Sequence, residues 1–276
     1  MRRSVASRAI RAVVVLAVVV WSALPIAFAV LSSFKPNQQI FAYPPVLLFA
    51  PTLEHYRDLL EKWPDFPRTL GNSLAVAAFA TLLCSGAALL AGYVYSRLRN
   101  RWAAASAFYM VAVRLLPPIV VTLPLFPLAD RLGLSDTRTV LVILYATFFV
   151  SLCTLILKSF IDGIPRELDE AAYIDGAGDL AILLRLILPL SAQGLVAASI
   201  FVVVYSWNEY LFAFIFTTSQ AKTAPLLLSE MMSSLTGVDW GLLFAAVTIQ
   251  LVPIVVFVML VQRFLISGLT AGALKG

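Results

Sequence analysis

Six long apolar runs constrain the fold of this chain more than any other feature of its sequence. Each is close to the roughly 20 mostly apolar residues that a helix needs to cross a bilayer. The six runs are Val13–Phe34, Leu70–Tyr95, Ala103–Leu125, Val140–Leu157, Leu195–Phe216 and Leu242–Leu265. Hydrophobic residues make up 61% of the 276 residues and charged residues only 13%, against roughly 25% charged in an ordinary globular domain. A soluble fold could not bury this much apolar surface. The sequence therefore predicts an all-α, polytopic membrane protein with six transmembrane helices.

The distribution of Lys and Arg indicates how these spans are oriented, because cytoplasmic loops of membrane proteins carry an excess of both. With the N-terminus in the cytoplasm, twelve of these residues fall inside and seven outside. The densest cluster, RLRNR at 97–101, then lies in a short cytoplasmic turn. Six spans return the C-terminus to the cytoplasm. The basic residues sit at the ends of apolar runs and form no stripe, so we expect no nucleic-acid partner.

The first apolar run has two interpretations. Its basic start and the sequence Ala27-Phe28-Ala29 are typical of a cleaved signal peptide. Its apolar stretch is longer than the roughly 7–15 residues of a signal-peptide core, which favours a retained transmembrane helix. The orientation of the other spans is the same under both interpretations.

The segments between the runs divide the chain into regions. We expect a cytoplasmic N-terminal tail at 1–12, the first transmembrane helix at 13–34 and an extracytoplasmic loop at 35–69. Residues 70–266 should form the core transmembrane domain with a cytoplasmic segment at 158–190, followed by a cytoplasmic tail at 267–276. Six prolines in 35–68 exclude one long helix there, although LEHYRDLLEKW at 53–63 has the pattern of a short amphipathic helix.

Residues that could carry catalysis or hold a metal are scarce. Cys84 and Cys153 each lie inside an apolar run, which predicts small core residues rather than a metal pair. His55 has no Cys or His nearby and is expected to be a loop side chain. The chain has no G-x-x-x-x-G-K-[ST] phosphate-binding loop and no Ser/His/Asp set. We therefore expect a protein that is not an enzyme and binds no cofactor itself.

A charged segment, ELDEAAYIDGAGDLAILLRLILPL at 167–190, separates the fourth and fifth apolar runs. Pro165 suits the first turn of a helix, and the acidic residues that follow it suit a helix N-terminus. Gly176 can end that helix in a left-handed conformation. Asp179 can then cap a second helix. The segment is thus predicted to be a short helix, a glycine turn and a helix that packs against the membrane domain.

The two predicted helices have different faces. In the first, Leu168, Ala171 and Ala172 share one face, and the small alanines leave room for another surface to approach. In the second, the apolar face consists of Leu180, Leu183, Leu184 and Ile187. Periodicity alone is equally compatible with an amphipathic helix that lies in the lipid headgroups.

The residues of this segment resemble the "EAA" motif in membrane subunits of bacterial ATP-binding-cassette (ABC) importers. The matching residues are Glu170, Ala171, Ala172, Asp175, Gly176 and Ala177, followed by Leu188-Pro189. In that family the short helix is a coupling helix that sits in a cleft of the cytoplasmic ATPase subunit. The resemblance implies that Glu170 meets a basic group on the ATPase and that Gly176 permits the turn.

Four other stretches resemble carbohydrate-importer permeases of the maltose-permease type. They are SSFKPNQQIFAYPP at 32–45 together with PTLEHYRDLL at 51–60, VRLLPPIVVTLPLF at 113–126, SWNEYLFAFIF at 206–216 and QRFLISGLTAGALKG at 262–276. The family usually has Asn where this chain has His55. The resemblance implies a type I ABC importer permease (MetI-like) fold in the bacterial inner membrane, and a C-terminal tail, Thr270–Gly276, that reaches toward the ATPase dimer.

The resemblance also implies the partners of this chain. They would be a second homologous permease subunit, two cytoplasmic ATPase subunits that hold ATP and Mg, and an extracytoplasmic solute-binding protein. Membrane lipid would surround the spans. The expected function is to form half of the translocation pathway for a sugar or sugar-like solute.

Polar residues at membrane depth are the candidates for the solute pathway. Arg114 lies near the middle of the third run, where a charge costs about 2.5–3.5 kcal/mol or more unless it faces protein or water. Pairing with Glu209 is the expected arrangement, and lining the pathway, where it would suit an anionic sugar derivative, is the alternative. Trp207, Asn208 and Glu209 have the chemistry to stack on a sugar and bond its hydroxyls, or equally to form an aromatic belt and helix contacts.

Two other functions remain open from the residues. An ion-coupled secondary transporter would need intramembrane carboxylates, of which Glu209 is the one clear candidate. An importer of the same class could carry a non-sugar solute such as an amino acid or a phosphate compound.

Overall fold

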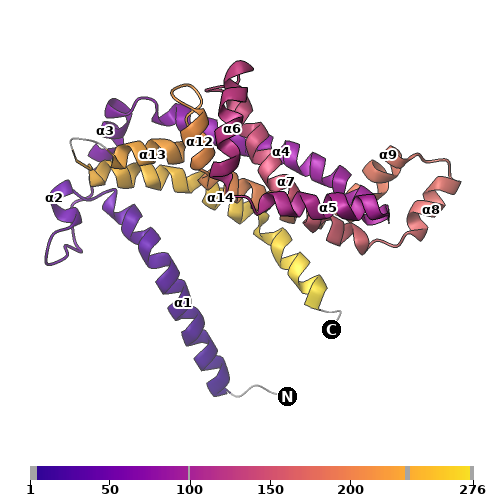
Figure 1. The fold of residues 1–276 in the computed structure, drawn as a ribbon. Coiled ribbons are helices and arrows are strands. Elements are labelled where there is room, and N and C mark those ends of the chain that lie inside the picture. Colours follow the sequence, from indigo (N-terminus) through magenta and orange to yellow (C-terminus); the bar gives the residue numbers. More distant parts are fainter. Residues whose placement is uncertain (1–4, 99, 234–236, 274–276) are drawn as a thin grey trace. The chain divides into compact units, whose positions relative to one another are not determined.

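The computed structural model describes residues 5–98, 100–233 and 237–273, and all regular elements among them are helices (Figure 1). The first half contains α1 (Val5–Ser32), α2 (Asn37–Ile40), α3 (Glu54–Lys62), α4 (Phe66–Arg97), α5 (Arg101–Arg114), α6 (Pro118–Arg131) and α7 (Arg138–Asp162). The second half contains α8 (Glu167–Ile174), α9 (Asp179–Ile182), a π-helix (Leu183–Ile187), α10 (Leu188–Leu190), α11 (Ala192–Asn208), α12 (Leu211–Phe216), α13 (Ala224–Met232) and α14 (Trp240–Ala273).

Four of these helices are long and apolar enough to cross a membrane by themselves. They belong to α1, α4, α7 and α14, which correspond to the first, second, fourth and sixth predicted spans. Two bent helix pairs raise the number of candidate spans to six if each pair counts as one span. The all-helical polytopic architecture is therefore confirmed, and its two bent spans are where the prediction needs correction.

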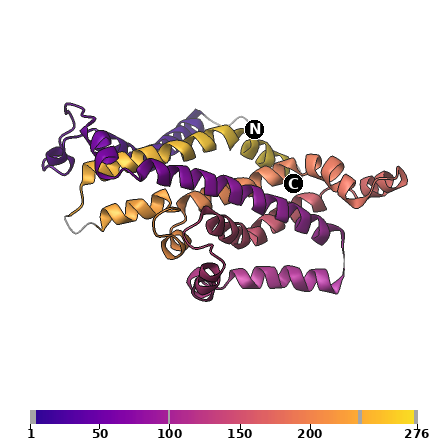
Figure 2. The same cartoon turned by 90° about the horizontal axis from the view of Figure 1, so that it is seen from above.

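The third predicted span, Ala103–Leu125, is not one helix. It consists of α5 and α6, which bend by 95° at a break between Arg114 and Pro118. In Figure 2 α5 lies lengthwise while α6 is seen almost end-on. Pro117 and Pro118 cause the break. Pro117 has a non-helical backbone conformation with φ −57° and ψ 132°, and Pro118 occupies the first position of α6.

The fifth predicted span, Leu195–Phe216, is also interrupted. Helix α11 ends at Asn208, and Glu209 takes an extended backbone conformation with φ −71° and ψ 132°. The short helix α12 begins at Leu211. Before α11, the segment Asp179–Leu190 meets it at a bend of 79°. A polar Asn-Glu pair thus ends the helix inside a run that reads as continuously apolar.

The two terminal helices reach into the segments predicted to be tails. Helix α1 begins at Val5, within the expected tail 1–12, and α14 continues to Ala273, within the expected tail 267–276. Residues 1–4 and 274–276 lie outside the described part of the chain. The structure therefore extends both terminal helices beyond the apolar runs that identified them.

One compact unit combines residues 1–67 with 228–253. In this unit His55 is 4% exposed and lies in α3, so it is not the loop side chain expected. Its Nε2 lies 2.7 Å from the carbonyl oxygen of Lys35, and a Cβ added at Gly241 would lie 2.3 Å from its ring. The short amphipathic helix predicted at 53–63 is confirmed as α3.

The other compact unit combines residues 68–227 with 254–276, and its core lies among α4, α7 and α11. Small residues allow close approach of these helices: a Cβ added at Gly194 of α11 would lie 2.5 Å from the ring of Phe160 on α7. The Ser85 hydroxyl on α4 lies 3.0 Å from the Ser199 hydroxyl on α11. Cys84 and Cys153 are free and fully buried in this core, as expected.

Side-chain caps fix where two of these helices begin. The Asn100 side chain accepts a hydrogen bond from the Ala103 N–H at 2.7 Å, and the Thr137 hydroxyl accepts one from the Val140 N–H at 3.2 Å. Both caps are supplied by residue types that favour helix N-termini. They start α5 and α7 at a polar residue directly before an apolar run.

Candidate functional site

The charged segment at 167–190 forms a projection at one end of its unit. Figure 1 shows α8 beyond the ends of α4, α5 and α7, and the view in Figure 2 agrees. Glu167, Asp169 and Glu170 occupy the first turn of α8, where the helix dipole favours negative charge. Pro165 lies two residues before the helix rather than in its first turn, because α8 begins at Glu167.

Gly176 ends α8 as the sequence predicts. Its φ of +83° is left-handed. The Ala177 N–H donates to the Ala172 carbonyl at 2.9 Å, and the Gly176 N–H donates to the Tyr173 carbonyl at 3.0 Å. These two bonds form a Schellman motif, which satisfies carbonyls that the helix end would leave unpaired.

The second half of the segment is less regular than predicted. Asp179 does not cap a helix with its side chain; its carboxylate instead accepts a hydrogen bond from the Tyr173 hydroxyl. The buried face consists of Ile182, Leu183 and Ile187, while Leu180 and Leu184 are exposed. The π-helix at 183–187 accounts for this shift, because its wider turn rotates the side chains relative to an α-helix.

The outward face of α8 is also rotated from the prediction. Glu170 and Ala171 are exposed, and Ile174 is 88% exposed. Ala172 packs against the core of its own unit, whereas Leu168 and Ala171 are exposed. The three residues therefore do not form the single face that the sequence predicts. The outward face therefore combines a carboxylate, a small residue and a large apolar residue, which is suited to a protein partner.

The positive φ at Gly176 predicts that alanine substitution is costly there and nearly neutral at the neighbouring Gly178. Gly176→Ala should destabilise the turn by about 1–2 kcal/mol, because a Cβ is strained in the left-handed region. Gly178→Ala should be close to neutral, since Gly178 is extended with φ −82° and has open space around it. Hydrogen exchange of the amides in α8, measured by mass spectrometry, compares the two variants. Equal exchange in both would contradict the assignment of strain to Gly176.

A cavity of about 460 Å³ lies among α4, α5, α6, α7 and α12 of the same unit. Its wall is mostly apolar, with a few hydroxyl groups, and Arg114 is the one charged residue among the described lining residues. Its polar and aromatic lining residues include Tyr95, Ser106, Tyr109, Arg114, Thr147, Phe148, Ser151 and Phe212. A largely apolar pocket with a few convergent polar groups is the usual form of a small-molecule site.

The ion pair expected between Arg114 and Glu209 is not present among the described residues. The guanidinium carbon of Arg114 lies 5.8 Å from the centroid of the Phe148 ring, within cation–π range. The Glu209 carboxylate accepts hydrogen bonds from the backbone N–H groups of Phe212 at 2.9 Å and Ala213 at 3.4 Å. Each charge thus has its own partner: an aromatic ring for Arg114, and the N-terminus of α12 for Glu209.

The other two candidates from the fifth run do not line the cavity. Trp207 is 4% exposed, so its ring is packed within the protein. The Asn208 side-chain amide donates to the Val204 carbonyl of its own helix at 2.7 Å. Sequence reasoning missed the hydroxyls of Thr147 and Ser151 in the cavity wall. Their spacing of four residues in an apolar run was the available signal, because it places both on one helix face.

A separate polar cluster joins the α6–α7 loop to the segment after α12. The Asp136 carboxylate accepts hydrogen bonds from the backbone N–H groups of Thr218, Ser219, Gln220 and Ala221 at 2.9–3.1 Å. The side-chain amide of Asn72 on α4 donates to the Gln220 and Lys222 carbonyls at 2.9 and 2.8 Å. The side-chain oxygen of Asn72 accepts a hydrogen bond from Nε of Arg138 at 2.7 Å. The cluster holds three helix ends together.

The hydrogen bonds to Asp136 predict a pH-dependent contribution to stability. Burial raises the pKa of this carboxyl, but the backbone N–H groups of Gln220, Ala221 and Thr218 outweigh it, so the pKa lies well below its usual range. The stabilisation should therefore be complete above the unfolded pKa of about 3.9 and should decrease as the pH falls below it. Asp136→Asn should lower the free energy of unfolding by about 1–3 kcal/mol at pH 7.

Thermal unfolding of the purified protein between pH 3 and pH 8 measures this difference. Asp130→Asn, at another acidic residue near the end of α6, is the matched control and should change little. A difference between wild type and Asp136→Asn that stays constant down to pH 3 would contradict the role of the ionised carboxylate.

Comparisons with known proteins agree with the fold and the segment just described. Residues 85–270 match the family model described as "Binding-protein-dependent transport system inner membrane component". The chain is 32% identical to the trehalose/maltose transport system permease protein MalG of Thermococcus litoralis, over 100% of both chains. It is 32% identical to the sulfoquinovosyl glycerol transport system permease protein SmoH of Agrobacterium fabrum, over 91% of this chain and 88% of SmoH.

A solved structure shows the same fold at lower identity. One chain of a bacterial ABC transporter involved in the import of the acidic polysaccharide alginate matches with a TM-score of 0.79, at 19% identity, over 95% of this chain and 99% of that chain. The family assignment favours the importer over the ion-coupled secondary transporter considered above. The chain belongs to the family of binding-protein-dependent transport system inner membrane components, and it is a membrane-spanning permease subunit of an ABC importer.

Proposed function

We propose that this chain forms half of the translocation pathway of an importer for a sugar or sugar-like solute. The names of its relatives carry this proposal: one serves trehalose and maltose, another sulfoquinovosyl glycerol, and a structural neighbour takes part in alginate import. All three solutes are carbohydrates or carbohydrate derivatives.

The chain is oriented with both termini in the cytoplasm of a bacterial cell and with the 158–190 segment on the same side. Twelve Lys and Arg inside against seven outside support this orientation. Its partners are a second homologous permease, two cytoplasmic ATPase subunits and an extracytoplasmic solute-binding protein. ATP and Mg are bound by the ATPase subunits. A solved relative of the same fold, in complex with an alginate pentasaccharide-bound periplasmic protein, supports the last of these partners.

Helix α8 docks into the ATPase subunit. Glu170, Ala171 and Ile174 form its outward face, and the Glu170 carboxylate has no hydrogen-bond partner among the described residues. An exposed carboxylate beside an exposed apolar side chain suits a cleft that offers a basic group and an apolar wall. Asp175, Gly176 and Ala177 form the turn that ends this face. In the coupling site these three residues shape the end of α8 and do not themselves form its outward face.

The cavity beside Arg114 is the part of the solute pathway that this subunit supplies. Hydroxyl groups of Ser106 and Thr147 are suited to bond sugar hydroxyls, and the rings of Tyr109 and Phe212 to contact apolar sugar faces. Arg114 adds a fixed positive charge, which favours a solute with anionic or strongly polar groups. Trp207, Asn208 and Glu209 act instead as packing and helix-capping residues beside this cavity.

Transport follows alternating access. Closure of the ATPase pair on ATP favours one permease state because the closed pair binds that state more tightly. The push on α8 converts the inward-facing permease to the outward-facing one, and the binding protein releases its solute into the cavity. ATP hydrolysis and opening of the ATPase pair return the permease to the inward-facing state.

Reconstitution of the complex tests this proposal. A complex purified through a tag on this chain should contain an ATPase subunit and a second permease, and in liposomes should take up labelled trehalose or maltose with ATP and its binding protein. A thermal-shift screen of that binding protein against neutral, phosphorylated and sulfonated sugars identifies the solute. ATP-dependent uptake of an amino acid, without binding of any sugar, would contradict the carbohydrate assignment.

A further inference from the structure

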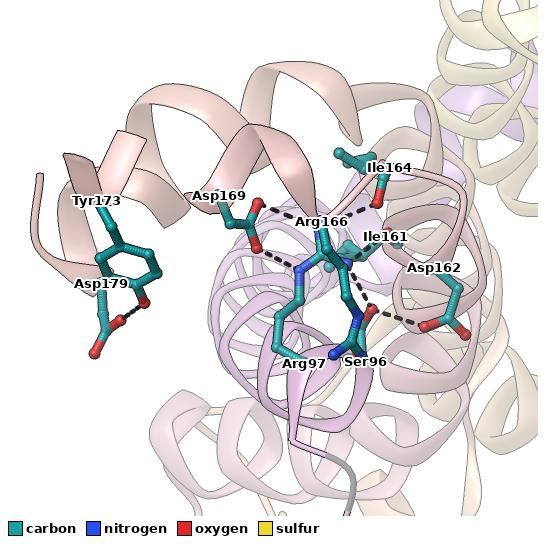
Figure 3. A network of polar contacts seen from close by, with 9 residues as sticks. All are labelled: Ser96, Arg97, Ile161, Asp162, Ile164, Arg166, Asp169, Tyr173 and Asp179. Atoms are coloured by element: carbon teal, nitrogen blue, oxygen red, sulfur yellow. Dashed lines mark hydrogen bonds and ion pairs between the residues drawn. The ribbon is translucent and has the colours of Figure 1, made fainter. Parts of the chain in front are cut away.

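Arg97, the last residue of α4, is the centre of a polar network at the base of α8 (Figure 3). Its Nε donates to one oxygen of Asp169 at 2.5 Å, and its Nη2 donates to the other oxygen at 3.3 Å. Nη1 reaches the Ile161 carbonyl and Nη2 the Ile164 carbonyl, both at 3.3 Å. One guanidinium therefore contacts the end of α4, the end of α7 and the first turn of α8.

The Arg97–Asp169 pair is enclosed by the protein. The two side chains are 13% and 8% exposed, in contrast to the ion pair of Lys158 and Asp162, whose side chains are 35% and 44% exposed. A guanidinium that donates to both oxygens of a carboxylate holds a defined orientation as well as a distance. The pair is therefore suited to fixing geometry, whereas the exposed pair contributes little.

Asp169 and Glu170 are neighbours on α8 with different surroundings. Asp169 is 5% exposed and turned toward α4, while Glu170 is exposed on the outward face of α8. A second link supports the same attachment, because Nη2 of Arg166 donates to the Ser96 carbonyl at 2.6 Å. A force applied to the outward face of α8 thus reaches α4 through two short polar contacts.

The network also leads toward the cavity. Tyr95 lies two residues before Arg97 on α4 and lines the cavity around Arg114. Ile161 lies on α7, whose residues Thr147 and Phe148 line the same cavity. By contrast, α8 continues at its other end into the Gly176 turn and the π-helix, a less regular connection. Arg97 therefore joins the first turn of α8 directly to α4 and α7, two of the helices that line this cavity.

We propose that Arg97 and Asp169 are positioning residues that make α8 move as one body with the ends of α4 and α7. The inference rests on the proposed docking of α8 in an ATPase subunit and adds the route by which that contact reaches the solute pathway. Without the pair, the ATPase should still bind the permease and hydrolyse ATP, but its closure should no longer change the cavity.

A reporter cysteine in the cavity tests this without knowledge of the solute. Ser106→Cys places a thiol in the cavity wall, while native Cys84 and Cys153 are 0% exposed and should react slowly. The rate of labelling by a water-soluble maleimide is measured in the purified complex, with and without ATP and vanadate. In the complex that carries Ser106→Cys and no other substitution, ATP and vanadate should change the labelling rate.

We expect Asp169→Asn and Arg97→Gln to reduce that change about fivefold or more, a typical size for loss of coupling between two sites. Their complexes should keep the ATPase activity measured without solute. Lys158→Gln is the matched control, because it removes an exposed ion pair that reaches Arg97 only through Asp162 and Ser96, and it leaves both bonds between Arg97 and Asp169 in place. It should leave the change in labelling as it was.

Arg97→Lys tests the inference even if complete loss of the ion pair prevents the complex from assembling. It retains the charge that Asp169 needs but lacks the planar fork that reaches Asp169, Ile161 and Ile164 together. It should assemble and still lose the nucleotide-dependent change. A reporter response unchanged in Arg97→Lys and Asp169→Asn, or lost equally in Lys158→Gln, would overturn the inference alone. A reporter complex without ATPase activity, or without any response to ATP, would overturn the proposed function and the inference with it.

Discussion

Glu170→Ala should reduce ATP-driven solute uptake about tenfold or more while the permease itself remains folded. The Glu170 side chain is exposed and makes no hydrogen bond or ion pair within the described part of the chain, so its removal breaks no internal contact. Loss of one partner of a hydrogen-bonded charge pair at an interface costs about 2–5 kcal/mol, which exceeds the 1.4 kcal/mol of a tenfold effect. The measurements are uptake into liposomes and the ATPase activity stimulated by the solute-loaded binding protein.

Glu167→Ala is the matched control for this variant. Glu167 is also an exposed carboxylate in the first turn of α8, so both substitutions remove the same favourable interaction with the helix dipole, about 0.3–1 kcal/mol. Only Glu170 belongs to the predicted docking motif. Near-wild-type uptake in Glu170→Ala, with a normally assembled complex, would show that the docking assignment is wrong. An equal loss in Glu167→Ala would assign the effect to helix stability instead.

The features that the sequence predicts best are those that depend on local backbone geometry. Gly176 ends α8 in a left-handed turn because glycine has no Cβ, and the residues on either side of it supply the bonds of the Schellman motif. The long spans follow from apolar length alone. Neither property requires knowledge of which residues meet across the fold.

The features that the sequence predicts poorly depend on contacts between distant segments. The Asp136 carboxylate accepts hydrogen bonds from backbone N–H groups about 82 residues away, and no pattern in either segment predicts this contact. The prolines at 117 and 118 signal a break, but the bend of 95° also depends on how α6 packs against α12. Long-range pairing of this kind follows only from the assembled fold.

The error over Glu209 has a specific physical cause. An intramembrane carboxylate needs partners, and the sequence offered Arg114 as the opposite charge. Backbone N–H groups at a new helix N-terminus satisfy it equally well, and the break after Asn208 creates such a terminus in the same stretch of chain. Residue composition cannot distinguish an ion pair with Arg114 from hydrogen bonds to the N-terminus of α12. The helix break that creates this terminus is visible only in the structure.

The arrangement around Arg114 predicts which of two residue pairs is energetically coupled. Arg114→Ala should lower uptake about tenfold, because it removes the one charge among the described residues that line the cavity. Phe148→Leu should lower it less, by loss of a cation–π contact of about 0.5–2 kcal/mol. If the two side chains act together, the double variant should lose less than the sum of the two single effects.

Glu209→Gln provides the contrasting pair. The carboxylate serves α12 and makes no ion pair with Arg114, so the effects of Arg114→Ala and Glu209→Gln should add within about 0.5 kcal/mol. Uptake rates in the four members of each double-mutant cycle, together with thermal unfolding to detect loss of structure, give both coupling energies. Coupling between Arg114 and Glu209 beyond that limit, with none between Arg114 and Phe148, would mean that the charges pair in the working complex. Additivity for Glu209 with coupling to Phe148 would assign Arg114 to the cavity, where its charge faces the solute rather than a carboxylate.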